Sequence, residues 1–201
     1  LAAVLAVAAI MVIAASRAAV RRPARSFSGA ALMAFITLVC TGLITTAFVT
    51  GVVIGKQPWY APQYLIPLLG MVLGNGLTGI SLCLDHLLET LAERSNEVEM
   101  ELAHGATRWE AARAPLAESV RRGMIPIINS MSVVGIVSLP GMMTGQILAG
   151  ANPVEAVKYQ VVVMFMIAGA TSMGCISIAV LVYHRLFNQR HQLETQRIRK
   201  R

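Results

Sequence analysis

Four long stretches of this chain contain no Lys, Arg, Asp or Glu, and this feature limits its possible folds more than any other. The stretches cover residues 29–54, 63–84, 124–149 and 159–183. A helix of about 20 mostly apolar residues crosses the roughly 30 Å hydrocarbon core of a bilayer. Charged residues make up 13% of the chain, against about 25% in an ordinary soluble domain. The sequence therefore predicts an all-α, polytopic membrane helical bundle that forms one domain.

Residues 1–16 form a fifth apolar stretch, which is short for a membrane span, and the chain does not begin with Met. We expect it to be the end of a span in an N-terminally truncated sequence. A signal peptide is the alternative, but its basic residues precede the apolar segment. Here Arg17 and Arg21 follow that segment.

The basic residues are distributed unevenly along the chain, which has a formal net charge of +7. All of the 17 except Lys56 and Lys158 lie in residues 17–25, 94–122 and 185–201. The positive-inside rule then places the central polar segment, residues 85–123, and the C-terminus in the cytoplasm of a multi-pass cell-membrane protein. Anionic lipid headgroups are the expected partners of these residues. Nucleic acid is not expected, because the basic residues adjoin membrane spans and lack interleaved aromatics.

Residues 85–104 have the pattern of an amphipathic helix, in which the leucines share one face. Five acids recur at every fourth position on the other face: Asp85, Glu89, Glu93, Glu97 and Glu101. Like charges at this spacing destabilise a helix by a few tenths of a kcal/mol per pair. Solvation of the acids is one reading. The other is that this acidic ridge meets basic residues of a partner or collects cations near a pore.

A short polar element follows this helix. Gly105 is expected to end the helix, because glycine adopts a positive φ without a steric penalty. Thr107 and Glu110 have the spacing of a capping box that begins a new helix, and Pro115 is expected to limit its extension. The sequence thus predicts a short helix, with Trp109 in its first turn, between two spans. An ordinary surface helix-turn-helix is the alternative.

Polar residues inside the apolar stretches mark a candidate transport path, because such groups are costly in lipid unless they face protein or water. The candidates are Asn75, Asn129, Thr144 and Gln146. Pro140 is expected to kink or interrupt the span at 124–149. Two GxxxG pairs, 70–74 and 141–145, are expected to pack helices closely.

Metal ligands are sparse in these stretches. Met142 and Met143 are soft thioether ligands, although apolar filling is their default reading, and Glu155 lies at the end of a span to receive an emerging cation. The cysteines show no CxxC spacing, which indicates buried apolar thiols rather than a zinc site or disulfides. They are Cys40, Cys83 and Cys175.

Residues 139–150, which read Leu-Pro-Gly-Met-Met-Thr-Gly-Gln-Ile-Leu-Ala-Gly, and Lys158-Tyr159-Gln160 resemble the signature of the FetB-type permeases. These are membrane subunits of a bacterial iron-export ABC transporter and are related to plant aluminium-tolerance permeases. The loop at Gly105, Ala106 and Thr107 is similar to the Gly-Ala-Ser/Thr core of ABC coupling helices. Members of this family are longer at the N-terminus, which implies that one or two spans are missing here.

The resemblance implies a function and a set of partners. The chain would pair with a second copy and with a separate ATPase subunit, which binds ATP, and would itself need no cofactor and carry no catalytic residue. Gly105, Ala106, Thr107, Trp109 and Glu110 would contact the ATPase. Another metal or a sugar nucleotide is an alternative substrate. An ATPase-independent carrier or an intramembrane enzyme would need a carboxylate, a His or a nucleophile–base pair within a span, and none is seen.

Overall fold

A computed structural model describes residues 2–53, 62–188 and 192–200 of the chain. The predicted outer loop with Lys56, and Arg190 of the basic tail, lie outside these residues. Seven α-helices are present in the described part, and helix α2 continues as a π-helix over Val49–Val53. The α-helices are α1 (Ala2–Arg21), α2 (Ala30–Phe48), α3 (Pro62–Glu93), α4 (Ser95–Ala103), α5 (Arg108–Val133), α6 (Gly141–Leu148) and α7 (Pro153–Leu186).

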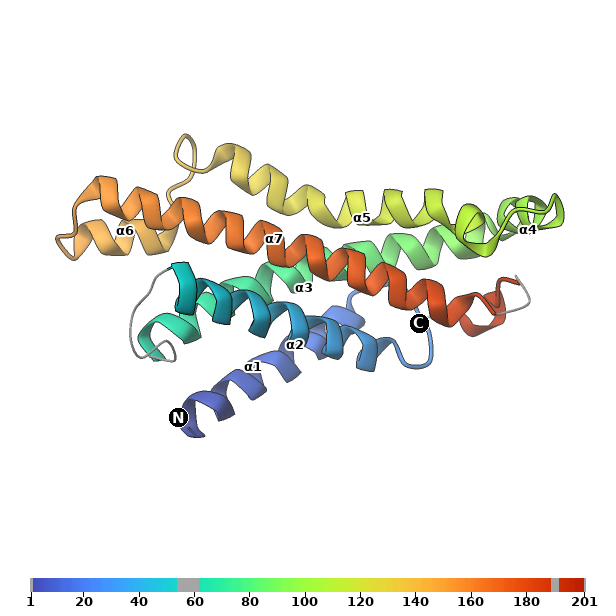
Figure 1. Cartoon of the computed structure of the whole chain (residues 1–201), viewed down its shortest axis with the longest axis horizontal. Coiled ribbons are helices and arrows are strands. Elements are labelled where there is room, and N and C mark those ends of the chain that lie inside the picture. Colours follow the sequence, from blue (N-terminus) through green and yellow to red (C-terminus); the bar gives the residue numbers. More distant parts are fainter. Residues whose placement is uncertain (1, 54–61, 189–191, 201) are drawn as a thin grey trace.

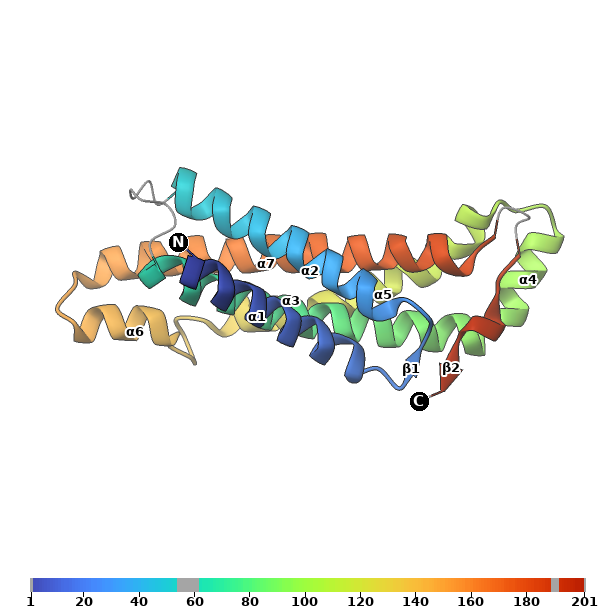
Figure 2. The same ribbon diagram turned by 90° about the horizontal axis from the view of Figure 1, so that it is seen from below.

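The long helices run roughly along one axis (Figure 1). α5 lies along one edge of the bundle, α3 and α7 lie in the middle, and α2 and α1 cover the opposite side (Figures 1 and 2). The all-α membrane bundle predicted from the sequence is confirmed. By length and composition, three of the described helices can cross a membrane: Ala30–Gly51, Leu65–Glu93 and Pro153–Leu186.

The C-terminal tail folds back across the end of the bundle at which α7 ends. After α7 it forms a 3₁₀ turn at Thr195–Arg197 and a short strand, β2 (Arg199–Lys200). This strand pairs antiparallel with β1 (Arg25–Ser26), in the loop between α1 and α2. The tail therefore connects the last helix to the first loop, a link that the sequence analysis did not predict.

The stretch at 124–149 is two helices rather than one. α5 ends at Val133, and Gly135 adopts a φ of +83° in the turn that follows. Pro140 is the N-cap of α6, which continues in the direction of α5 before the chain reverses into α7 (Figure 1). The predicted interruption is present, but it begins before Pro140 because the glycine turn ends α5 first.

The predicted helix at 85–104 is also divided. Its first part continues α3 to Glu93, and Arg94 separates it from α4. The predicted apolar face is nevertheless correct, since Leu84, Leu87, Leu88 and Leu91 are all buried in the core. The amphipathic pattern specifies which face is buried and does not require an unbroken helix.

α3, α5 and α7 meet most closely at Gly79 and Gly123. A Cβ atom on Gly123 would lie 2.7 Å from Cys175 Sγ and 2.8 Å from the Gly79 carbonyl oxygen. A Cβ atom on Gly79 would lie 2.5 Å from Thr171 Cγ2 and 3.0 Å from the Gly123 carbonyl oxygen. Only glycine fits at either position, so each backbone packs directly against the other.

The predicted GxxxG pairs do not pack in this way. No atom of the described residues lies within 4 Å of a Cβ placed on Gly74, Gly141 or Gly145, and Gly70 meets only the end of the Met11 side chain. Within the described part of one chain, these pairs therefore make no close helix crossing. Cys83 and Cys175 are fully buried near the Gly79–Gly123 crossing, as expected of apolar thiols, whereas Cys40 is exposed.

The crossing gives a first prediction. Gly123→Ala should destabilise the bundle by about 1–3 kcal/mol, the usual cost of overpacking, because the new methyl overlaps the Gly79 carbonyl. Gly145→Ala, in open space in α6, is the matched control and should be neutral or slightly stabilising. Thermal unfolding of the purified protein in detergent measures both. Equal midpoints for Gly123→Ala and the wild type would contradict the packing argument.

Candidate coupling element and transport path

The loop between α4 and α5 begins with a well-formed helix end. Gly105 has a φ of +93°, which favours glycine. Its N–H donates to the Leu102 carbonyl at 3.1 Å, and the Ala106 N–H donates to the Glu101 carbonyl at 3.1 Å. This pair of bonds is a Schellman motif, which satisfies the last carbonyls of α4. The predicted helix stop at Gly105 is confirmed.

The predicted capping box begins α5. The Glu110 N–H donates to Thr107 Oγ1 at 3.3 Å, and the Thr107 N–H donates to Glu110 Oε2 at 2.7 Å. The hydrogen bond from the Thr107 N–H and a second from its hydroxyl lower the pKa of Glu110 from its usual 4.5. The carboxylate therefore stays ionised at neutral pH and keeps both hydrogen bonds.

The first turn of α5 is attached to the end of α7 by aromatic contacts. The rings of Trp109 and Tyr183 pack edge to face, with centroids 5.4 Å apart. The Arg108 guanidinium carbon lies 5.8 Å from the centre of the Tyr183 ring, and Arg108 Nη1 donates to the Asn188 carbonyl at 3.4 Å. Such stacking and cation–π contacts stabilise by about 0.5–1.5 kcal/mol each. The role of Tyr183 was not predicted from the sequence, although an aromatic residue at a helix end is a usable signal.

The expectation of a short, isolated helix is wrong. α5 runs without a break from Arg108 through Pro115 to Val133. A proline inside a helix costs about 3 kcal/mol or more, since it removes one backbone hydrogen bond. Burial of Ala111, Ala112 and Leu116 against neighbouring helices outweighs this cost. The element is therefore the capped first turn of a helix about 39 Å long that enters the membrane bundle.

The acidic ridge is partly neutralised within the chain itself. Arg25 pairs with Glu93 at 3.0 Å, and the Ala24 N–H donates to Asp85 Oδ1 at 2.8 Å. The Arg25 side chain is 18% exposed, so this pair is partly shielded from solvent. The loop between α1 and α2 thus supplies a basic partner that the sequence analysis sought in another protein.

The four candidate path residues occupy two places. Asn75 on α3 is half-buried and Asn129 on α5 is exposed, and both helices pack at the Gly79–Gly123 crossing. Thr144 and Gln146 lie on α6, which packs against α7. The structure therefore does not bring all four into one site.

A second buried amide, Gln160, was not among the residues predicted to line the path. Gln160 on α7 is 4% exposed. The Oε1 atoms of Gln146 and Gln160 are both buried without a partner among the described residues. A glutamine within an uncharged apolar run was the available signal for Gln160.

The candidate metal ligands are not gathered into one site. Met142 packs against the core cluster that contains Met166, whereas Met143 is buried outside that cluster. Glu155 pairs with Lys158 at 2.8 Å on the surface. Across residues 2–53, 62–188 and 192–200, no group of three His, Cys, Asp or Glu side chains is placed to hold a metal ion.

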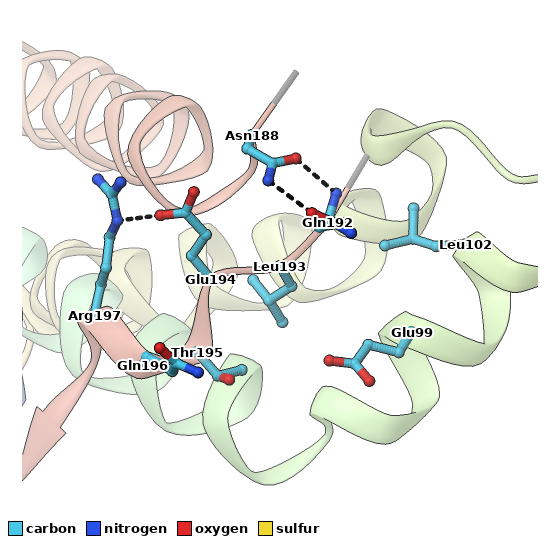
Figure 3. A pocket seen from close by; sticks show the side chains of 9 residues that line it. All are labelled: Glu99, Leu102, Asn188, Gln192, Leu193, Glu194, Thr195, Gln196 and Arg197. Carbon is cyan, nitrogen blue, oxygen red and sulfur yellow. Dashed lines mark hydrogen bonds and ion pairs between the residues drawn. The ribbon is translucent and has the colours of Figure 1, made fainter. Parts of the chain in front are cut away.

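A cavity of about 680 Å³ lies between α4 and the C-terminal tail (Figure 3). Two of its lining residues, Asn188 and Gln192, form a pair of hydrogen bonds. Asn188 Nδ2 donates to Gln192 Oε1, and the Gln192 N–H donates to Asn188 Oδ1, both at 3.0 Å. Glu194 pairs with Arg197 further along the tail. Since Asn188 also accepts the bond from Arg108, the tail supports the start of α5.

Comparison with known proteins gives a family and no solved structure. The model of the uncharacterised protein family UPF0014 matches residues 1–187. A UPF0014 membrane protein of Synechocystis sp. is 39% identical over 159 residues, which are 79% of this chain and 61% of that protein. No solved structure matches the chain.

Two further relatives carry functional names. The probable iron export permease protein FetB of Escherichia coli K12 is 37% identical over 142 residues, 71% of this chain and 55% of its own length. Protein ALUMINUM SENSITIVE 3 of Arabidopsis thaliana is 36% identical over 136 residues, 68% of this chain and 50% of its own length. The chain spans about half to three fifths of the length of these relatives. Because the family model covers most of its residues, the chain belongs to the UPF0014 family of membrane proteins.

Proposed function

We propose that this chain is the membrane-spanning permease subunit of an ABC exporter, acting with a second copy of itself and with a separate ATPase subunit that binds ATP. The observation that carries the proposal is the capped turn at Thr107. It is a small rigid body joined directly to α5 and, through Trp109 and Tyr183, to α7. A force applied to this turn by a partner is transmitted to two long helices of the bundle at once.

The positions of the basic residues support a cytoplasmic location for this turn and for the C-terminus. The beginning of α5 and the C-terminal end of α7 lie at the same end of the bundle (Figure 1). Arg108, Arg113 and Arg185 are at that end, where a cytoplasmic ATPase has access.

Iron is the proposed substrate, on the basis of the relative named as a probable iron export permease. The side chains at membrane depth are amides, hydroxyls and thioethers, which bind a cation weakly. Passage through a membrane requires sites that a substrate leaves as readily as it enters. The name of the Arabidopsis relative makes aluminium the second candidate.

Transport in vesicles tests this function. Vesicles that contain the complete protein and its ATPase should move Fe(II) when ATP is supplied, and Gly105→Pro should abolish transport without preventing assembly. Proline fixes φ near −65°, whereas Gly105 requires +93°. Gly105→Asn is the control, since asparagine tolerates the left-handed region, and it should retain transport.

The outcomes separate the parts of the proposal. ATP hydrolysis by the complex without iron movement in any variant would reject iron and keep the permease. Full transport by Gly105→Pro would reject the loop as the coupling element.

The capping box gives a further prediction. Thr107→Ala should cost about 1 kcal/mol of local helix stability and lower the amount of substrate moved per ATP hydrolysed, while Thr107→Ser should restore both. Hydrogen exchange at residues 108–112 measures the local effect without a partner. Unchanged exchange in Thr107→Ala would show that the box does not hold this turn.

The pH dependence of this turn follows from the lowered pKa of Glu110. Its contribution to stability is complete above the usual pKa of 4.5 and is lost as pH falls through the lower value in the folded protein. Hydrogen exchange in this turn, corrected for the intrinsic rate, should therefore be flat around neutral pH and rise only in acid. Glu110→Gln should remove that acid transition, since glutamine also forms a capping box.

A further inference from the structure

Two grooves of different character border α5. On its α3 side, a groove of about 590 Å³ carries charged residues of both signs, among them Asp85, Glu89, Arg121 and Arg122, beside the apolar Leu82, Ile125 and Pro126. On its α7 side, a groove of about 370 Å³ is almost wholly apolar, with Leu116, Val120, Ile176 and Val180 among its lining residues. The two exposed flanks of one helix therefore suit different surroundings.

The polar character of the α3 side continues to membrane depth. On α5, Arg122, Ile125, Asn129 and Ser132 are exposed at spacings of three or four residues, which places them on one face. On α3, Asn75, Thr78, Leu82 and Asp85 follow the same spacing, with Leu82 exposed and the other three half-buried. Thr78 and Asp85 accept hydrogen bonds from Arg22 and Ala24, so the loop after α1 borders this side. We call these eight residues the α3–α5 face.

At membrane depth, the side-chain amide of Asn129 is the group on this face that would be least favourable in contact with lipid. Asn129 is exposed, and its side chain has no hydrogen-bond partner among the described residues. A polar group exposed to lipid is unfavourable, so such groups face protein or water in membrane bundles. The α3–α5 face, although it also contains exposed Leu82 and Ile125, is therefore less favourable in lipid than a wholly apolar face.

The exposed face of α7 offers the contrast. Its large exposed side chains at membrane depth are apolar and recur along one side of the helix: Val157, Val161, Phe165, Met173 and Ile176. The exposed large side chains of α1 and α2, such as Ile10 and Ile36, are apolar too. Lipid satisfies these surfaces without any protein partner.

We propose that a second copy of the chain packs on the α3–α5 face. This surface rests on the two-copy arrangement proposed above and specifies which helices form it. A two-fold axis along the membrane normal places α3 of each copy opposite α5 of the other, at the same depth. Among the described residues of one chain, Arg121 and Arg122 form only exposed pairs with Glu118, at 4.0 and 3.5 Å, and such pairs contribute little. Glu89 of one copy then approaches Arg121 and Arg122 of the other, which gives the surface opposite charges on its two halves.

The same symmetry brings the two amides together. α3 and α5 run antiparallel and cross at Gly79 and Gly123 (Figure 1). Asn75 is four residues and Asn129 six residues from this crossing toward the same end of the bundle, about 6 and 9 Å at 1.5 Å per residue. Asn75 of one copy therefore faces Asn129 of the other. Two such pairs line a polar path that one chain alone leaves open on one side.

Cross-linking between differently tagged copies tests this surface. The complete protein, with exposed Cys40 changed to Ser, is co-expressed in membranes as one copy with Asn75→Cys and another with Asn129→Cys. Oxidation should give several-fold more mixed-tag dimer than the control pair Phe165→Cys and Ile176→Cys on the α7 face. Cys83 and Cys175 are buried and should not contribute.

Each outcome has a separate meaning. Stronger cross-linking of the α7 pair would overturn the proposed surface. The surface would also be overturned if mixed-tag dimers form, and maleimide labels the cysteines at positions 75 and 129, but these two cysteines do not cross-link. Absence of mixed-tag dimers would overturn the two-copy arrangement itself. Co-purification of the ATPase is measured in parallel. If the ATPase binds but the two cysteines do not cross-link, the proposed surface fails and the transporter assignment stands. If the cysteines cross-link but no ATPase binds, the surface stands and the transporter assignment fails.

Discussion

The direct backbone contact between Gly79 and Gly123 is the constraint on which the rest of the bundle depends. Because neither residue has a side chain, α3 and α5 approach until each carbonyl occupies the space of the other's missing Cβ, and Cys175 of α7 fills the remaining side. This approach fixes the height of α5 relative to both neighbours. It also determines which residues of α5 face the charged groove and which face the apolar one. Larger residues at the crossing would separate the helices that form both grooves.

The crossing also explains how a surface turn is linked to the membrane. α5 contacts α7 at two levels, through Trp109 on Tyr183 at its start and through Gly123 on Cys175 further along. Two contacts along a continuous helix resist rotation as well as translation, so the start of α5 cannot move without α7. The close packing at Gly79 adds α3 to this unit. Motion imposed at Thr107 would therefore move three helices together, and the proposed second copy would be the surface against which they move.

The parts of the fold that local chemistry dictates could be predicted from the sequence, and those that depend on distant contacts could not. Gly105 and the Thr107–Glu110 box act within one turn, and both are present as predicted. The apolar face at Leu84–Leu91 follows from periodicity alone. Pro115 was misjudged because its cost is local while the burial that offsets it is tertiary. Neither Gly79 nor Gly123 has a second glycine at GxxxG spacing. Of the glycines in the two predicted GxxxG pairs, Gly70 meets only the end of the Met11 side chain and the other three stand in open space.

The order of chemical groups along the exposed side of α5 gives the α3–α5 face its direction. Charged Arg121 and Arg122 come first, then the amide of Asn129 and the hydroxyl of Ser132, and finally the break after Val133, where the backbone leaves its helical hydrogen bonds. Irregular backbone at membrane depth is tolerated only where protein or a wet cavity surrounds it, and interrupted helices of this kind form transport sites in other membrane proteins. Charge, amide, hydroxyl and open backbone thus follow one another from the charged groove toward the far end of the bundle. Facing lipid, each of these groups would carry an unfavourable desolvation energy, and facing a second copy, all of them are covered by a single interface.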